Sequence, residues 1–419
     1  MKKILLISAL LLMCGFTSHS QTVDPDADSD IETSENPVID VDNADDTELV
    51  SIPAYIKLNR NHVILNGANW SQLRNAMSKV GTHPVSIVHI GDSHLQADIA
   101  TGHVRRSLQM DHGNAGRGLI APLKMSGTNQ PSDYTFASTM SWNAAKLMKW
   151  PWNQTMGFTG TSISPNQRQS HIMLSTGKDE DYNPFSAITL FHKGKLNVTR
   201  VENHEGTPMM FTASPSQDYT YLQLTESVDN VKIYFDSAGD LTLFGASLSG
   251  NRPGVFYHTI GNNGAAYSTY NRVGNIGQGI VPLNPDLVII SLGTNEAFGR
   301  RNVPEFISAM DRLVKSIQGT NPNAQVMLVT PMECQKSVYS TVNKRVKGRK
   351  RRSRSRTVKQ KVRSYAVNAN ILPIRNAIMQ YGKDNNIAVY DWYEVAGGQG
   401  ASELGLRTSC LAMIVCIIH

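Results

Sequence analysis

The stretch that decides the fold is Val85-Ser86-Ile87-Val88-His89-Ile90, which runs directly into Gly91-Asp92-Ser93-His94. A short apolar run predicts a buried β-strand, and the glycine after it predicts a turn. Ser93 would then lie at the carboxyl end of a strand. If the strand belongs to a parallel sheet, this is the edge where α/β proteins build their sites.

The rest of the chain predicts such a sheet. Further apolar runs at residues 286–292, 326–329 and 387–390 predict three more buried strands. Apolar residues at helical spacing predict helices between the strands, and these cover Gln96–Met110, Val303–Ile317 and Ile374–Tyr381. Alternating strand and helix is typical of an α/β domain in three layers, with a parallel sheet covered on both faces.

The middle of the chain has a different character. Residues 113–254 show weak helical periodicity and many Gly, Ser, Thr, Asn and Pro residues. We expect an inserted, sandwich-like β-rich module here that splits the α/β domain into residues 51–112 and 255–403. The predicted strands of the insert cover Ala187–His192, Tyr219–Leu224, Val231–Phe235 and Leu241–Leu248.

The N-terminus reads as an export signal. Lys2 and Lys3 precede an apolar stretch from Ile4 to Phe16, and small residues around Ser20 allow cleavage before Gln21. The stretch is shorter than the ~20 residues of a membrane span, so no transmembrane segment is expected. We therefore expect residues 1–20 to be a signal peptide and the protein to be secreted to the periplasm or cell surface.

The net charge of +6 hides two strongly charged segments. Residues 21–50 hold eleven acidic and no basic side chains, which predicts a disordered linker. Residues 344–363 hold twelve basic and no acidic ones. The first interpretation is a solvated basic loop, and the second is attraction to an anionic cell-envelope polymer. Nucleic acid is not expected as a partner, because the protein is predicted to be exported and no aromatic residue is interleaved before Tyr365.

Two later segments complement Ser93 chemically. A serine becomes a nucleophile when a base removes its proton, and acyl transfer also needs hydrogen-bond donors aimed at the developing oxyanion. Residues 261–265 (Gly-Asn-Asn-Gly-Ala) contain glycines that let a backbone N–H approach closely, and residues 293–296 (Gly-Thr-Asn-Glu) offer the side-chain amide of Asn295. Each motif alone is common in plain turns, but their occurrence together and in this order is far more specific.

With these three motifs, the chain resembles the SGNH/GDSL hydrolase superfamily over roughly residues 80–403. The matching blocks are Gly91-Asp92-Ser93, the glycine of Asn263-Gly264, and Gly293-Thr294-Asn295. The resemblance implies that Ser93 is the nucleophile. It also implies that the oxyanion hole consists of the Ser93 amide, the Gly264 amide and the Asn295 side chain, with Gly261 as the alternative to Gly264.

The longer strings at residues 91–96 and 293–298 are similar to those of bacterial peptidoglycan O-acetylesterases, which carry a β-rich insert between the first two blocks. The resemblance implies a secreted esterase that removes O-acetyl groups from peptidoglycan or another polysaccharide, without a metal or organic cofactor. Two alternatives stay open. One is a carbohydrate-binding protein that has lost catalysis, and the other is an O-acyltransferase that uses the same serine.

The chain departs from the family at its last block, D-x-x-H, which supplies the base and the Asp that orients it. No histidine here has an Asp three residues before it, so a catalytic Asp and His are not found in this sequence. His94 and His89 lie near the nucleophile, but we expect both to make structural contacts, and Asp92 as well.

The last residues suggest a cause. Residues 410–418 are nine consecutive apolar residues, which fit either a buried C-terminal element or an aberrant tail. In the frame one base earlier, the codons across Met413–Ile414 must contain GAT, for Asp, and those across Cys416–Ile417 must contain TAT or CAT, for Tyr or His. We therefore expect that residues 404–419 follow a frameshift that removes the D-x-x-H block.

Overall fold

The structure is a computed structural model that describes residues 53–178, 182–237, 239–274, 276–300, 302–346 and 356–407. A six-stranded sheet forms the centre of the α/β domain, with strand order β1-β20-β17-β16-β2-β15. All neighbouring pairs are parallel except β1 with β20. The strands are β1 (Val63–Ile64), β2 (Val85–Gly91), β15 (Val255–Gly261), β16 (Leu287–Ser291), β17 (Gln325–Val329) and β20 (Ala388–Tyr390).

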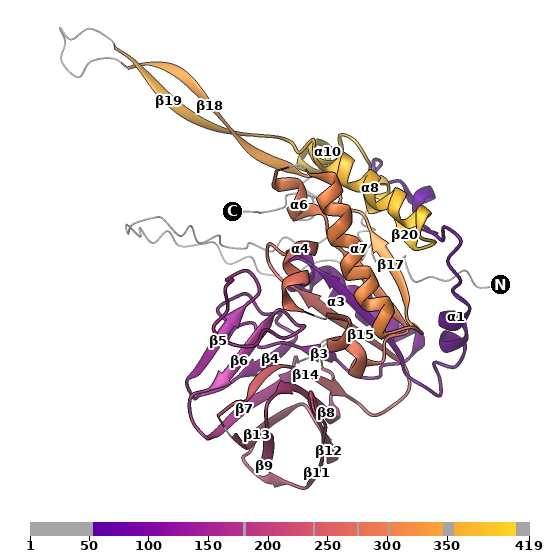
Figure 1. Ribbon diagram of the computed structural model, residues 1–419, viewed down its shortest axis with the longest axis vertical. Helices are drawn as coiled ribbons and strands as arrows, with labels where there is room; N and C mark the ends of the chain where they lie inside the picture. Colours follow the sequence, from indigo (N-terminus) through magenta and orange to yellow (C-terminus); the bar gives the residue numbers. More distant parts are fainter. Residues whose placement is uncertain are drawn as a thin grey trace, which may run out of the picture.

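Strand β2 lies inside the sheet, and all seven of its residues are buried. Its side chains alternate between two apolar cores. Val88 and Ile90 pack in the core shared with one set of helices, whereas Val85 and Ile87 pack in the core of the opposite face. The predicted three-layer α/β architecture is therefore confirmed (Figure 1).

Helices supply the two outer layers. One face is covered by α4 (Tyr267–Tyr270), α5 (Ile276–Ile280), α7 (Val303–Thr320) and α8 (Ile371–Asp384). The other face is covered by α1 (Ser71–Ser78) and α3 (Ile99–His112). Short helices α2 (Ser93–Gln96), α6 (Thr294–Phe298) and α9 (Trp392–Val395) follow the strand ends, and α10 (Ala401–Arg407) ends the described chain.

The inserted module is a sandwich of two antiparallel sheets, as the sequence predicts. One sheet has the order β10-β9-β13-β7-β4 and the other has the order β11-β12-β8-β14-β6-β5, with β3 beside β14. Their inner faces share one apolar core, in which Ile188, Leu222 and Ile233 are fully buried. The strands are β3 (Gly118–Ile120), β4 (Tyr134–Ala137), β5 (Trp142–Lys146), β6 (Thr161–Pro165), β7 (Gln169–Thr176), β8 (Phe185–Lys193), β9 (Leu196–Asn203), β10 (Pro208–Met209), β11 (Phe211–Pro215), β12 (Tyr219–Val228), β13 (Asn230–Ser237) and β14 (Thr242–Ser249).

A buried ionic network joins the insert to the α/β domain. Arg117 and Asp133 come from the insert, and Asp98 and Arg105 come from the α3 region. Arg117 Nη2 lies 3.0 Å from Asp98 Oδ2, and Arg105 Nη2 lies 2.7 Å from Asp133 Oδ2. The four side chains are at most 11% exposed, so each charge depends on its partners in place of water.

The basic segment differs from the expected loop. It belongs largely to a long hairpin of β18 (Gln335–Val346) and β19 (Arg356–Val367), which extends away from the α/β domain (Figure 1). Valines recur along both strands, including Val338, Val342, Val358 and Val362, and β-branched residues favour extended backbone. The many basic residues in this segment favoured the prediction of a solvated loop, so the recurring valines were not recognised as a strand pattern.

The predicted signal peptide at 1–20, the acidic linker at 21–50 and most of the predicted aberrant tail at 404–419 lie outside the described residues. Residues 404–407 belong to α10. None of the helices in the described part of the chain has both the length and the apolar character needed to cross a membrane.

Candidate active site

The three motifs meet at one edge of the central sheet because the strands that carry them are neighbours in register. Gly91 at the end of β2 pairs with Gly261 at the end of β15 on one side. On the other side it pairs with Ser291 at the end of β16. The segments that follow these three residues therefore leave the sheet side by side, with Ser93 in the middle.

Ser93 begins α2 and is partly exposed, whereas the residue before it is buried. Asp92 caps the helix, because its Oδ1 accepts the backbone N–H of His94 at 3.1 Å. The same carboxylate also contacts His94 Nδ1 at 2.9 Å and Asn295 Nδ2 at 3.3 Å. Asp92 thus has the structural role expected from the sequence, since it fixes the turn that presents Ser93.

The loop after β15 is held against the Ser93 helix. The N–H of Asn263 donates to Gln96 Oε1 at 2.6 Å. Gly264 has a φ of +76°, a conformation that residues with side chains rarely adopt. A Cβ on Gly261 would lie 2.2 Å from the backbone N of Gln96, so Gly261 is needed for close packing between β15 and α2.

Asn295 connects this loop to the Ser93 turn. It lies in α6, just after Gly293 with its φ of +124°. Its Nδ2 donates to the carbonyl of Ala265 at 2.8 Å and, over a longer distance, to Asp92. All three segments singled out from the sequence are therefore linked through one amide group.

Glu296 adds a second link that the sequence analysis did not single out. Its Oε1 accepts the backbone N–H of Tyr267 at 2.8 Å, which fixes the start of α4 just beyond the Gly264 loop. Its Oε2 is buried without a hydrogen-bond partner in the described structure. Burial raises the pKa of Glu296 to about 7. Its place directly after Asn295 was the only signal in the sequence.

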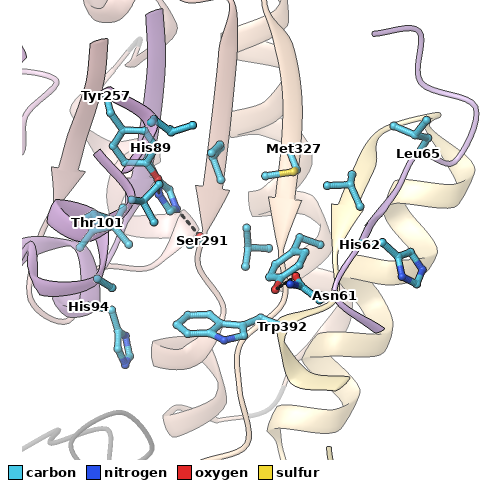
Figure 2. A pocket seen from close by; sticks show the side chains of 18 of the residues that line it. Asn61, His62, Leu65, His89, His94, Thr101, Tyr257, Ser291, Met327 and Trp392 are labelled. Carbon is cyan, nitrogen blue, oxygen red and sulfur yellow. Dashed lines mark hydrogen bonds between the residues drawn. The ribbon is translucent and has the colours of Figure 1, made fainter. Parts of the chain in front are cut away.

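Two histidines near Ser93 were considered as a base. Both ring nitrogens of His89 are engaged, by Tyr257 Oη at 2.7 Å and Ser291 Oγ at 2.6 Å. Burial lowers the pKa of His89 to about 3, so this ring is neutral and structural. Figure 2 shows the ring of His89 between Tyr257 and Ser291, with the hydrogen bond to Ser291 drawn as a dashed line.

His94 pairs with Asp92 and lies edge-on to Trp392, with ring centroids 6.5 Å apart. Burial acts to lower its pKa, but the charge of Asp92 and the hydrogen bond to it prevail, so the pKa is raised overall. Within the described residues, no hydrogen bond joins Ser93 Oγ to a histidine. The sequence as a whole lacks a D-x-x-H block, and residues 408–419 of the tail expected to follow a frameshift lie outside the described residues.

A cavity of about 870 Å³ lies beside this edge, on the face of the sheet covered by α1 and α3. Apolar side chains such as Met327 and Trp392 form most of its wall, with His89 and His94 on one side and His62 on the other (Figure 2). His94 and Trp392 also line a small pocket that reaches Asp92 and Thr294. The cavity is therefore adjacent to the candidate site, although Ser93 is not part of its wall.

The chain was compared with known proteins by sequence and by structure. Residues 234–407 match the sequence model of the GDSL-like Lipase/Acylhydrolase family, a range that includes Gly264 and Asn295. This part of the chain is similar in sequence to GDSL-like lipases and acylhydrolases. No curated protein matches the sequence of the chain.

A solved structure of a peptidoglycan O-acetylesterase shares the fold of this chain, with a TM-score of 0.61 at 16% sequence identity. The match covers 83% of this chain and 90% of the other, so it includes the inserted module. A family two carbohydrate esterase from Clostridium thermocellum in complex with cellohexaose has 10% identity and a TM-score of 0.23, and covers 66% of this chain and 99% of its own. The fold expected from the sequence is therefore confirmed, including the β-rich insert.

Proposed function

We propose that the protein is an exported serine esterase that removes O-acetyl groups from a polysaccharide, with peptidoglycan as the first candidate. The observation that carries the proposal is the meeting of Ser93, the Gly264 loop and Asn295 at the ends of three adjacent strands. Support for the substrate comes from the fold shared with a peptidoglycan O-acetylesterase. Support for export comes from the sequence of residues 1–20 alone.

In this proposal Ser93 Oγ attacks the acetyl carbonyl while a base takes its proton. The carbonyl oxygen becomes an oxyanion that the amides of Ser93 and Gly264 and the side chain of Asn295 stabilise. The sugar hydroxyl then leaves with a proton, and water hydrolyses the acetyl-Ser93 intermediate to acetate. The 3.3 Å bond from Asn295 Nδ2 to Asp92 is the weaker of its two, and we expect the oxyanion to replace it.

We further propose that the base comes from a D-x-x-H block encoded in the shifted reading frame past residue 403. Support comes from the codons forced by Met413–Ile414 and Cys416–Ile417, which allow Asp and His at the required spacing. The present sequence would then bind substrate but turn over slowly, since a serine without its base loses several orders of magnitude in rate.

The test is acetate release from O-acetylated peptidoglycan, with de-O-acetylated peptidoglycan as the control substrate. The proposal expects release by the frame-restored protein and none by its Ser93→Ala variant. If acetate moves to an added sugar acceptor in preference to water, the protein is an acyltransferase. If the polymer is bound but no acetate is released by the frame-restored protein, the esterase proposal is wrong.

A further inference from the structure

The β18–β19 hairpin is a two-stranded ribbon whose strands pair only with each other among the described residues. Twelve residues of each strand are in register, and the ribbon projects far from the α/β domain (Figure 1). A ribbon of two strands gains little stability alone, so its length calls for a role other than support of the core.

The register sorts the side chains onto two faces, because residues opposite each other in antiparallel strands point the same way. Tyr339 lies opposite Arg363, and Tyr365 lies opposite Ser337. The face that they share, called here the tyrosine face, also carries two lysines. Its aromatic and basic members are Tyr339, Lys359, Lys361, Arg363 and Tyr365, and Gln335, Ser337, Thr341, Asn343, Thr357 and Val367 lie on the same face.

The opposite face, called here the valine face, carries four valines, one alanine, two lysines and three uncharged polar side chains. Its described members are Lys336, Val338, Ser340, Val342, Lys344, Val358, Gln360, Val362, Ser364 and Ala366. Both aromatic rings and three of the five described cations therefore lie on the face opposite these four valines. This two-faced arrangement is not visible from the density of positive charge alone.

On the tyrosine face, cations and rings contact each other while remaining open to solvent. Lys361 Nζ lies 4.4 Å from the ring centroid of Tyr339, and the guanidinium of Arg363 lies 5.1 Å from that of Tyr365. The two tyrosines are 58% and 57% exposed. Neither strand contains Asp or Glu, so the hairpin itself offers no carboxylate to neutralise these charges. An anionic partner would complement this face.

The shape of the face fits an extended polymer. Tyr365 and Lys359 are six residues apart on the same strand, so this face extends about 20 Å along the ribbon. The exposed sides of tyrosine rings pack against the C–H faces of sugar rings, and lysine and arginine bind the carboxylates or phosphates that such sugars carry. An anionic polysaccharide presents both chemical groups repeatedly along one chain.

The base of the hairpin is attached to the candidate active site. The N–H of Asn368 donates to the carbonyl of Cys334 at 2.8 Å, which closes the base of the ribbon. The side chains of Asn368 and Asn370 both donate to the carbonyl of Ala297 at 3.0 Å. Ala297 belongs to α6, the same short helix that carries Asn295.

We propose that the tyrosine face of the hairpin binds an anionic polysaccharide and holds it beside the edge of the sheet where Ser93 lies. The binding does not require the ester chemistry of Ser93. It is therefore tested separately from the proposed function.

The test uses the full chain and polygalacturonate, a polymer of anionic sugars, with affinity measured over a series of salt concentrations. Lys361→Gln combined with Arg363→Gln removes two cations from the tyrosine face. Lys336→Gln combined with Lys344→Gln removes the same charge from the valine face and is the matched control. We expect the first pair to weaken binding about tenfold or more and the control pair to weaken it much less.

A third variant, Tyr339→Ser with Tyr365→Ser, leaves the charge unchanged, and we expect it to weaken binding at every salt concentration. Ser93→Ala should bind as the wild type does. Thermal unfolding of each variant should match the wild type, since the hairpin does not pack in the apolar cores. Equal losses in the two charge pairs, no binding of polygalacturonate by the wild type, or tighter binding of single-stranded DNA would each overturn the proposal.

Discussion

Asn295 donates its side-chain amide to the carbonyl of Ala265 at 2.8 Å, and this bond joins two chain segments 30 residues apart across the edge of the sheet. The same amide reaches Asp92, the residue before the candidate nucleophile. The position of Asn295 therefore depends on both neighbouring segments. A group held in this way needs to exchange only its longer hydrogen bond, the one to Asp92, to receive an oxyanion.

Replacing Asn295 with Ala should lower the kcat of acetyl-ester hydrolysis by about 10²–10³-fold, which is typical of losing one oxyanion donor. Asn321→Ala is the matched control, because Asn321 is also buried and donates to a backbone carbonyl, that of Gly277, away from the strand ends that carry the site. We expect this control to reduce stability and leave kcat near the wild-type value. Equal effects of the two substitutions on kcat would show that Asn295 acts through folding alone.

Glu296→Gln should change how stability depends on pH. The pKa of Glu296 is raised by burial from 4.5 to about 7, so between these values the folded state holds a proton that the unfolded state releases. Its contribution to stability is fully present below pH 4.5 and is lost as the pH rises through 7. The difference amounts to about 3 kcal/mol in the free energy of unfolding.

The Gln variant keeps an acceptor for the N–H of Tyr267 and cannot ionise. Urea unfolding at several pH values from 4 to 8 measures the effect, with the wild type as reference. We expect the variant to lose less stability than the wild type as the pH rises. Parallel curves for the two proteins would mean that Glu296 ionises normally in the folded state.

Asp133→Ala should destabilise the junction between the insert and the α/β domain. It leaves the buried guanidiniums of Arg105 and Arg117 with one carboxylate fewer, and breaking such a network costs about 3–5 kcal/mol. Asp218→Ala is the control, because its pair with Lys193 is about half exposed. Thermal unfolding should show a large drop for the first variant and almost none for the second, and similar drops would contradict a buried network.

Resequencing the gene past codon 403 tests the proposed origin of the base. We expect a frame in which Asp and His codons stand three positions apart. The frame-restored protein should then hydrolyse a chromogenic acetyl ester several orders of magnitude faster than the present chain. A tail confirmed in frame, with no such codons downstream, would eliminate this explanation.

The buried strands of the sheet were predictable because strands covered on both faces form continuous apolar runs. The run at residues 85–90 became β2, and those near 287 and 326 became β16 and β17. β15 was not predicted, because Tyr257 and His258 interrupt the apolar pattern of its sequence. Their polar atoms are satisfied only in the fold, where Tyr257 Oη contacts His89 and His258 Nδ1 accepts the N–H of Leu119.

The helix expected over Gln96–Met110 is divided in the structure. Asp98 has a φ of +53°, which ends α2 before α3 begins. This conformation places its carboxylate in the ionic network with Arg105 and Arg117, and local sequence patterns do not reveal such a long-range contact. Tertiary interactions therefore determine where α2 ends and α3 begins.

At the candidate site, the sequence predicted that Ser93, Gly264 and Asn295 lie in turns. It could not show that the three turns lie close together. Adjacent strands in register bring their segments together, and this depends on the strand order, which the sequence did not reveal. Glu296 could not be identified in the same way, because its raised pKa results from burial in the finished fold.

The most direct test of the central claim is to locate the acetyl group during turnover. The frame-restored protein is mixed with a chromogenic acetyl ester, quenched in acid within the first turnovers, digested and analysed by mass spectrometry. We predict an acetyl group on Ser93, absent from the Ser93→Ala variant, which should also release no acetate. Acetate release that persists in Ser93→Ala, or an acetyl group found on another residue, would contradict it.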